Sequence, residues 1–123
     1  MKIAIPLDEN HQNICPAFGR TPFIMYYNTE NDSYLVEKNI AENERGGAGL
    51  KTAQIMLDHN IDAIITYRLG ENAAEVFKLA EAKIYKAEDV DVFQNLLLFK
   101  ENKLQPLTKF HAGFQGKLWR SLF

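Results

Sequence analysis

A loop near the amino terminus gathers side chains that could bind a metal or an anion. His11, Cys15 and Arg20 follow closely on a short apolar run that ends at Leu7. A thiolate and a neutral imidazole suit a thiophilic metal or an exposed iron of a cluster, and a guanidinium can hold an anion by charge-assisted hydrogen bonds. A plainer interpretation stays open, in which Cys15 is a small buried hydrophobic residue and His11 a solvated loop residue.

Two glycine-bearing segments could bind an anion through their backbones. Residues 46–49 read Gly-Gly-Ala-Gly before a helical pattern, and glycine lets N–H groups approach an anion at the positive end of a helix. In residues 66–75 an apolar strand gives way to a helix near Gly70 and Asn72, with Arg68 between them. Each segment could instead be structural, as a flexible helix entry or a plain capped strand-to-helix turn.

A histidine near the carboxyl end is a further candidate ligand. His111 has small neighbours that leave its ring accessible, so it could reach over the sheet edge as a third ligand beside Cys15 and His11. It could equally be a tail residue without such a role. No pair of acids, and no nucleophile with an adjacent base, stands at a recognisable spacing, so the sequence does not predict catalysis.

The elements that must position these residues change in type near residue 46. Before it, apolar runs predict a central strand and a β-hairpin; after it, strand and helix patterns alternate, which is typical of parallel strands with crossover helices. A mixed sheet follows. The expected strands cover residues 2–7, 22–28, 34–39, 62–67 and 83–86.

Three helices are expected to pack on this sheet, each with one apolar face. They cover residues from about 46 to 60, from 72 to 80 and from 90 to 100. For the last helix, the predicted buried stripe consists of Val90, Phe93, Leu96 and Leu97.

Size and composition indicate a single cytoplasmic domain. The 123 residues are enough for one core without disulfides, and a net charge of −2 gives no field that would gather nucleic acid or anionic lipid. One cysteine excludes an internal disulfide and a cluster site built from several thiolates of one chain. No apolar run is long enough to span a membrane, and the amino terminus does not read as a signal sequence.

The last part of the chain has no clear periodicity but is rich in aromatic residues. We expect residues 108–123 to form a C-terminal tail that packs on its own domain or on a neighbouring subunit, as in a homodimer. The aromatic residues are Phe110, Phe114, Trp119 and Phe123.

Four segments, in this order, resemble one known family. Over roughly residues 1–107 the chain is similar to the dinitrogenase iron-molybdenum cofactor biosynthesis family, a domain also found in the nitrogenase accessory proteins NifX and NafY and at the end of NifB. The resemblance implies a ribonuclease-H-like α/β fold with helices on both faces of a mixed five-stranded sheet. The segments are Met1-Lys2-Ile3-Ala4-Ile5-Pro6, Cys15-Pro16-Ala17-Phe18-Gly19-Arg20, Gly46-Gly47-Ala48-Gly49 and Thr66-Tyr67-Arg68-Leu69-Gly70-Glu71-Asn72-Ala73.

The resemblance also implies a role in binding rather than catalysis. A member would bind, carry or protect an iron–sulfur or iron–molybdenum cluster precursor, with a cluster-assembly or acceptor protein as its partner. Many members have a histidine directly before the Phe-Gly-Arg of the first loop, whereas this chain has Ala17, which removes one ligand. A small-anion or nucleotide-binding regulatory module is the alternative.

The residues expected to hold such a cluster come from the three loops. They are Cys15, Phe18, Gly19, Arg20, Gly46, Gly47, Gly49, Arg68, Gly70 and Asn72, and the expected metal ligands are Cys15, His11 and His111.

Overall fold

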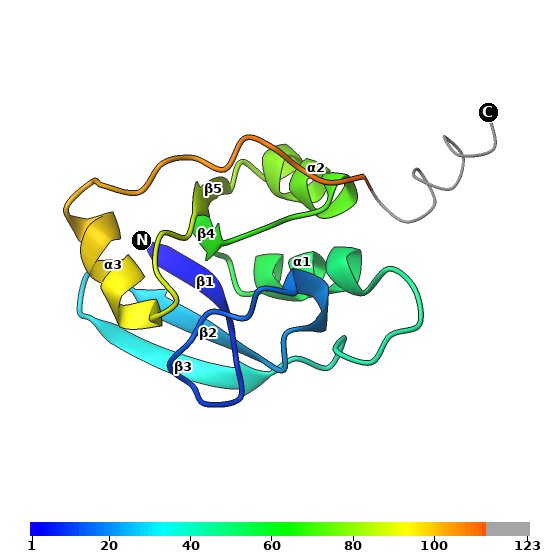
Figure 1. Ribbon diagram of the computed structural model, residues 1–123, viewed down its shortest axis with the longest axis horizontal. Helices are drawn as coiled ribbons and strands as arrows, with labels where there is room; N and C mark the ends of the chain where they lie inside the picture. The colour runs from blue at the N-terminus through cyan, green and yellow to red at the C-terminus, as the bar shows by residue number, and fades with distance from the viewer. Residues whose placement is uncertain (113–123) are drawn as a thin grey trace.

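The fold is organised around one sheet that combines antiparallel and parallel pairing (Figure 1). A computed structural model describes residues 1–112, in which five strands lie in the order β3-β2-β1-β4-β5. β1 pairs antiparallel with β2 and parallel with β4, so the predicted mixed sheet is confirmed. The strands are β1 (Lys2–Leu7), β2 (Phe23–Asn28), β3 (Ser33–Lys38), β4 (Ala63–Thr66) and β5 (Lys83–Lys86).

Helices cover both faces of this sheet and give three layers (Figure 1). α1 (Ala48–Leu57) and α2 (Glu71–Leu79) pack on one face, and α3 (Val92–Lys100) packs on the other. A short 3-10 turn, η1 (Phe18–Arg20), lies in the loop between β1 and β2. None of the helices in residues 1–112 has the length and apolar character needed to cross a lipid bilayer.

The buried stripe predicted for the last helix is wrong for three of its four residues, and only Leu96 is buried as expected. Val90, Phe93 and Leu97 are 54%, 41% and 49% exposed, whereas Val92 and Leu96 face the sheet. The reason is the fully buried Asn95, whose carboxamide oxygen accepts the N–H of Glu88 at 2.8 Å and whose nitrogen donates to nearby carbonyls. Burial of an amide is tolerated when its hydrogen bonds are all made, so the helix can place the side of Asn95 against the sheet.

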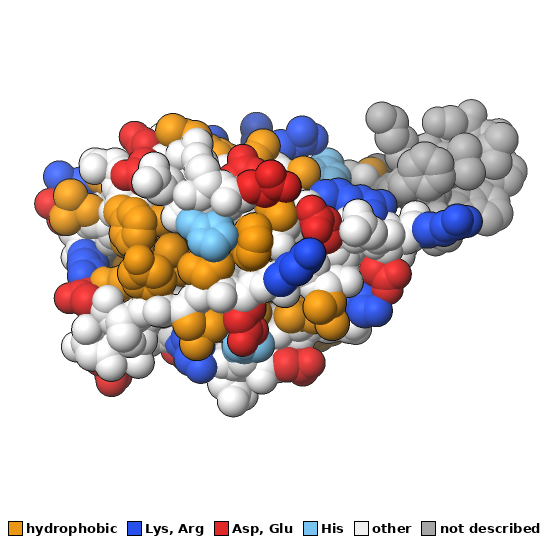
Figure 2. Space-filling view, turned by 90° about the horizontal axis from the view of Figure 1, so that it is seen from below, with side chains coloured by type: hydrophobic (Ala, Val, Ile, Leu, Met, Phe, Trp, Pro, Cys, Tyr) orange, Lys and Arg blue, Asp and Glu red, His pale blue; other side chains and the backbone are white. Residues whose placement is uncertain are grey.

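Hydrophobic side chains also remain at the surface elsewhere in the molecule. Figure 2 shows a group of them on one face, interrupted by few charged residues. Tyr34 and Leu35, on the end strand β3, are each about half exposed. An end strand leaves backbone N–H and C=O groups unpaired, and exposed apolar side chains beside them favour association with another chain.

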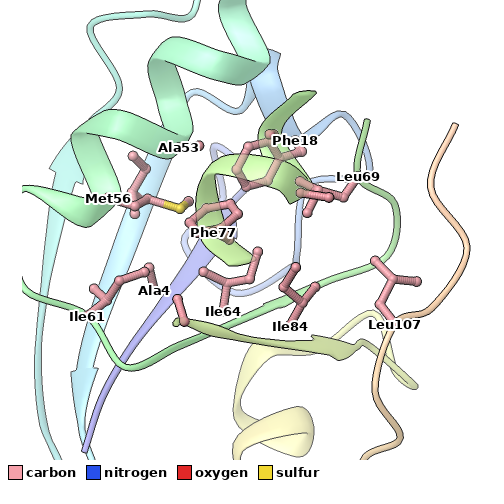
Figure 3. Packing of buried hydrophobic residues seen from close by; sticks show 14 of the residues in the cluster. Ala4, Phe18, Ala53, Met56, Ile61, Ile64, Leu69, Phe77, Ile84 and Leu107 are labelled. Carbon is pink, nitrogen blue, oxygen red and sulfur yellow. The ribbon is translucent and has the colours of Figure 1, made fainter. Parts of the chain in front are cut away.

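The core between α1, α2 and the sheet also fixes the loop that follows β1 (Figure 3). Phe77 of α2 is fully buried and meets the ring of Phe18 edge to face, with centroids 6.0 Å apart. Met56 of α1 and Ile64 of β4 complete this packing. Because Phe18 belongs to η1, burial of its ring holds the neighbouring loop residues against the body of the domain.

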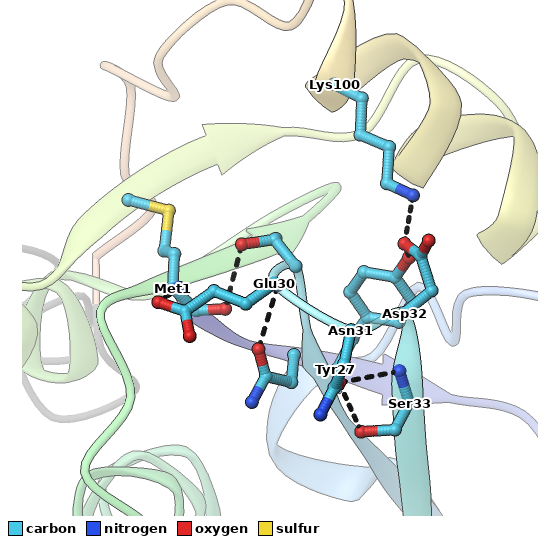
Figure 4. A network of polar contacts seen from close by, with 9 residues as sticks. Met1, Tyr27, Glu30, Asn31, Asp32, Ser33 and Lys100 are labelled. Atoms are coloured by element: carbon cyan, nitrogen blue, oxygen red, sulfur yellow. Dashed lines mark hydrogen bonds and ion pairs between the residues drawn. The ribbon is translucent and has the colours of Figure 1, made fainter.

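A polar network joins the β2–β3 turn to α3 and to the amino terminus (Figure 4). The Asp32 carboxylate accepts hydrogen bonds from Lys100 and from the Tyr27 hydroxyl. These bonds hold the pKa of the Asp32 carboxyl below its usual value, with the Lys100 ammonium as the larger cause. The Met1 ammonium lies 3.7 Å from Glu30, so both ends of the turn are fastened.

Part of the predicted aromatic tail packs on its own domain. The Phe110 ring lies against the α1–α2 core, with the Lys78 ammonium 4.5 Å from its centroid. The three other aromatic residues of the tail, Phe114, Trp119 and Phe123, lie outside the described residues.

Replacing Phe77 by alanine tests how much stability this core supplies. We expect F77A to lower the free energy of unfolding by about 3–5 kcal/mol, because it removes a fully buried aromatic ring and leaves a cavity. Denaturant unfolding followed by circular dichroism measures the change. Leu79 on the same helix is 77% exposed, so L79A should change stability by less than about 0.5 kcal/mol. Equal losses in the two variants would contradict the assignment.

Candidate functional site

The three loops singled out by the sequence line one pocket of about 890 Å³. Its walls are residues 16–20 after β1, residues 45–50 at the start of α1, and His111. Around the start of α2 the wall consists of Arg68, Gly70, Asn72 and Ala73. These segments are far apart in the sequence and meet because β1 and β4 are parallel neighbours whose carboxyl ends share one edge of the sheet.

Two glycines let the first loop lie directly on the start of α1. A Cβ placed on Gly19 would lie 2.6 Å from the Gly49 nitrogen and 2.8 Å from its Cα, closer than atoms can approach. A Cβ on Gly49 would instead meet nothing within 4 Å. Position 19 therefore requires glycine, because any Cβ there would collide with the backbone of Gly49. At position 49 the absence of a side chain leaves open space in the pocket.

Buried polar side chains strengthen the same contact, and the sequence pattern did not reveal them. Thr52 of α1 donates from its hydroxyl to the Gly19 carbonyl at 3.2 Å. The Asn39 amide donates to Thr52 and to the Thr21 carbonyl, and both Asn39 and Thr52 are almost fully buried. Nothing local in the sequence marks these residues, because their partners lie on other elements.

Two helices begin at the pocket without a side-chain cap. The N-cap of α1 is Gly47, in the left-handed conformation with φ of 71°, and the N-cap of α2 is Gly70. The first turn of a helix leaves N–H groups without intrahelical acceptors, and the helix dipole adds partial positive charge there. Both helix starts can therefore donate to an anion in the pocket.

The charged side chains of the pocket wall are all positive. Arg20, Arg45 and Arg68 line it, and no Asp or Glu of the described residues does so. No carboxylate in residues 1–112 forms an ion pair with Arg45 or Arg68. The sequence interpretation missed Arg45, although a cation directly before the Gly46-Gly47 pair was a readable signal.

Arg20 differs from the other two arginines because its guanidinium is already engaged. Its Nη1 donates to the Glu42 carbonyl at 3.0 Å and to the Glu44 carbonyl. These bonds join the first loop to the segment that leads into α1. Arg20 thus shapes the pocket, whereas the guanidinium groups of Arg45 and Arg68 make no hydrogen bond or ion pair within residues 1–112.

His111 reaches the pocket through a returning segment that we call the strap, residues 104–112. The strap runs back along β5 and then along the start of α2, where the Glu71 N–H donates to the His111 carbonyl at 2.9 Å. The imidazole lies beside Gly70, whose absent Cβ would be 3.2 Å from the ring. The prediction that His111 reaches over this edge therefore agrees with its position in the pocket wall.

Cys15 and His11 lie elsewhere. Cys15 is 7% exposed as a residue and does not line the pocket; its Sγ is 3.7 Å from the Ala17 carbonyl oxygen. His11 stands in a turn, with its ring 4.4 Å from that of Phe23, and does not line the pocket either. No three His, Cys, Asp or Glu residues within 1–112 are placed to hold a metal ion. The three expected ligands are thus not brought together.

Of the ten residues expected to hold a cluster, Cys15 is outside the pocket wall and the other nine belong to it. Ala17, where a histidine was expected from the resemblance, is also in the wall and exposed. A larger side chain at position 17 would therefore extend into the same space.

Comparison with known proteins gives matches over most of the chain. The family model described as dinitrogenase iron-molybdenum cofactor matches residues 1–102. An uncharacterized protein of Methanocaldococcus jannaschii is 33% identical over 108 residues, covering 85% of this chain and 90% of that protein.

Solved structures share the fold. The apo form of the orange protein from Desulfovibrio gigas has a TM-score of 0.80 at 19% identity, covering 87% of this chain and 92% of that one. A candidate NifB protein from Thermotoga has a TM-score of 0.73 at 28% identity, and the match covers 89% of this chain and 95% of that one. The α/β architecture is therefore that of these relatives.

Alanine at Gly19 and at Gly49 should have opposite effects on stability. We expect G19A to lower the free energy of unfolding by about 1–3 kcal/mol, because its Cβ collides with the α1 backbone. G49A should leave stability unchanged or raise it by up to about 1 kcal/mol, because the new methyl group meets open space and alanine favours helix. Thermal and denaturant unfolding measure both, and a neutral G19A would contradict the close contact.

The exposure of Cys15 predicts its reactivity. In the folded protein without cargo, the thiol should react with an aromatic disulfide reagent at least about a hundredfold more slowly than in denaturant, because local opening must precede attack. The release of the coloured thiolate gives the rate. If the thiol reacted as fast in the folded protein as in denaturant, it would be accessible to ligands, contrary to this expectation.

Proposed function

Because this chain belongs to the dinitrogenase iron-molybdenum cofactor family, we propose that its pocket binds and carries an anionic iron–sulfur or iron–molybdenum cluster precursor as a non-catalytic accessory factor. The observation that carries the proposal is the charge of the pocket wall. Arg45 and Arg68 are free of ion pairs in the described part of the chain, and no carboxylate joins them in the wall.

The electrostatics of the pocket suit an anionic cargo rather than a free metal cation. Positive guanidinium groups and two helix starts raise the potential in the pocket, which attracts anions and repels divalent cations. Cluster precursors carry net negative charge on their sulfides and thiolates. Hydrogen bonds from N–H groups to such sulfur atoms stabilise that charge further.

Size and exposure support a role in carrying a cargo. A volume of about 890 Å³ lies within the range of small-molecule sites, and most of the arginines and glycines of the wall are exposed. A bound cluster would remain accessible from solvent. A carrier must release its cargo to a cluster-assembly or acceptor protein, and an open rim allows such a partner to approach.

The mode of binding would rely on charge and hydrogen bonds more than on a thiolate. Cys15 is nearly buried and absent from the wall, so the imidazole of His111 is the protein ligand best placed to reach a metal of the cluster. A cluster held by one bond to the His111 imidazole and by contacts with arginine side chains would bind reversibly. Reversible binding is what transfer of the cluster to another protein requires.

A small-anion or nucleotide-binding role is the second candidate, and the same groups favour it. Phosphates also bind at helix starts beside arginine. The imidazole of His111 can bond to a metal of a cluster but only donate a hydrogen bond to a phosphate, so the two functions are separated by titrating the same variants with both ligands.

Loss of the free arginines should weaken cargo binding. We expect R45A and R68A each to raise the dissociation constant for a purified iron–molybdenum cluster precursor about tenfold or more, because each removes a charge-assisted contact. H111A should also weaken it, and C15S should change it little. Anaerobic titration followed by the cluster's visible absorption measures these constants.

The controls decide between the candidates. K103A removes a cation that is not in the pocket wall and should bind like the wild type. The same series titrated with ATP shows whether nucleotide binds instead. The carrier role fails if the wild type does not bind the cluster at millimolar concentration, and thiolate-based binding replaces our mode if C15S alone abolishes it.

A further inference from the structure

β3 is an end strand of the sheet and lies open to solvent. Among the described residues it pairs with β2 on one side and with no strand on the other. Of its residues, Val36 is half-buried and the others are exposed. The opposite end of the sheet differs, because the strap covers β5 through the bonds Lys86 N–H to the Gln105 carbonyl and Leu107 N–H to the Ile84 carbonyl.

The free backbone groups of β3 can be identified from its pairing with β2. The Asn39 N–H donates to the Pro22 carbonyl at 2.9 Å, just beyond the end of the β2–β3 ladder. Hydrogen-bonded pairs alternate along an antiparallel ladder, so the N–H and C=O groups of Tyr34, Val36 and Lys38 point away from β2. Nothing in residues 1–112 bonds to these groups.

We propose that β3 pairs antiparallel with β3 of a second copy of this chain, so that two sheets join across a twofold axis. The outward groups are symmetric about Val36. In the register that uses all of them, Val36 lies opposite Val36 of the second copy, and Tyr34 lies opposite Lys38 of the second copy. A strand that matches itself in this way forms an isologous interface.

The side chains fit this register. Tyr34 and Lys38 of the second copy meet on the α3 side of the sheet, where an ammonium can lie over an aromatic ring. Leu35 lies opposite Glu37 of the second copy on the α1 side. No like charges face each other directly, whereas a register centred on Lys38 would place two ammonium groups together.

The surface beside the edge explains why a folded partner would cover it. Tyr34 and Leu35 are 51% and 50% exposed on opposite faces of β3, and the Phe93 ring lies 5.7 Å from that of Tyr34. Each is apolar surface that loses contact with water in the dimer. β3 also contains no proline, so nothing in its backbone prevents pairing.

Charge substitutions at Tyr34 test both the dimer and its register. The full chain should convert from monomer to dimer with rising concentration in sedimentation equilibrium. Y34K should weaken the dimer about tenfold or more, because the new ammonium faces Lys38 of the second copy at two symmetric places. Y34E should keep or strengthen it through an ion pair, and the double variant Y34K/K38E should restore it.

Matched measurements exclude simple unfolding. Circular dichroism of each variant checks the fold, which should survive because Tyr34 is half exposed, and L79K on exposed α2 surface should dimerise like the wild type. The proposal is overturned if the wild type stays monomeric up to about 1 mM. It is also overturned if Y34K and Y34E weaken the dimer equally, or if all variants dimerise alike, since another surface would then be responsible.

Discussion

The close contact between Gly19 and the backbone of α1 is the constraint on which the pocket depends. It sets the first loop at atomic contact with the start of a helix, so that two segments distant in the sequence form one wall. Thr52 and Asn39 hold the contact with buried hydrogen bonds, and the Phe18 ring anchors it in the core. With a side chain at position 19, the helix start and the loop would have to separate.

This packing brings positive charges together in a wall to which no Asp or Glu of residues 1–112 contributes. Arg45 and Arg68 face a common space with two positive helix ends, an arrangement that costs the empty protein free energy through mutual repulsion. Arg20 escapes part of this cost by donating to backbone carbonyls. An anion in the pocket relieves the repulsion. Relief of this repulsion would thus contribute part of the free energy with which the pocket binds the proposed cargo.

The order and type of the elements could be predicted from the sequence because they follow local hydrophobic patterns. The convergence of the three loops could also be predicted, since parallel strands end at one edge. The burial of Cys15 and the second role of Arg20 could not, because they depend on carbonyls and packing partners remote in the sequence. Asn95 illustrates the same limit: read as a polar residue it belongs outside, yet its bonds to residues 88–91 turn it inward.

The strap forms one wall of the pocket through a small set of contacts with the rest of the domain. It is held by backbone bonds to β5 and to the start of α2, and by little else than Leu104, Leu107 and Phe110 in the described core. Such a segment can open without unfolding the sheet, and opening would carry the imidazole of His111 away from its place. A cargo that contacts His111 would therefore favour the closed strap and slow hydrogen exchange at the β5 edge, and a closed strap would in turn favour binding of that cargo.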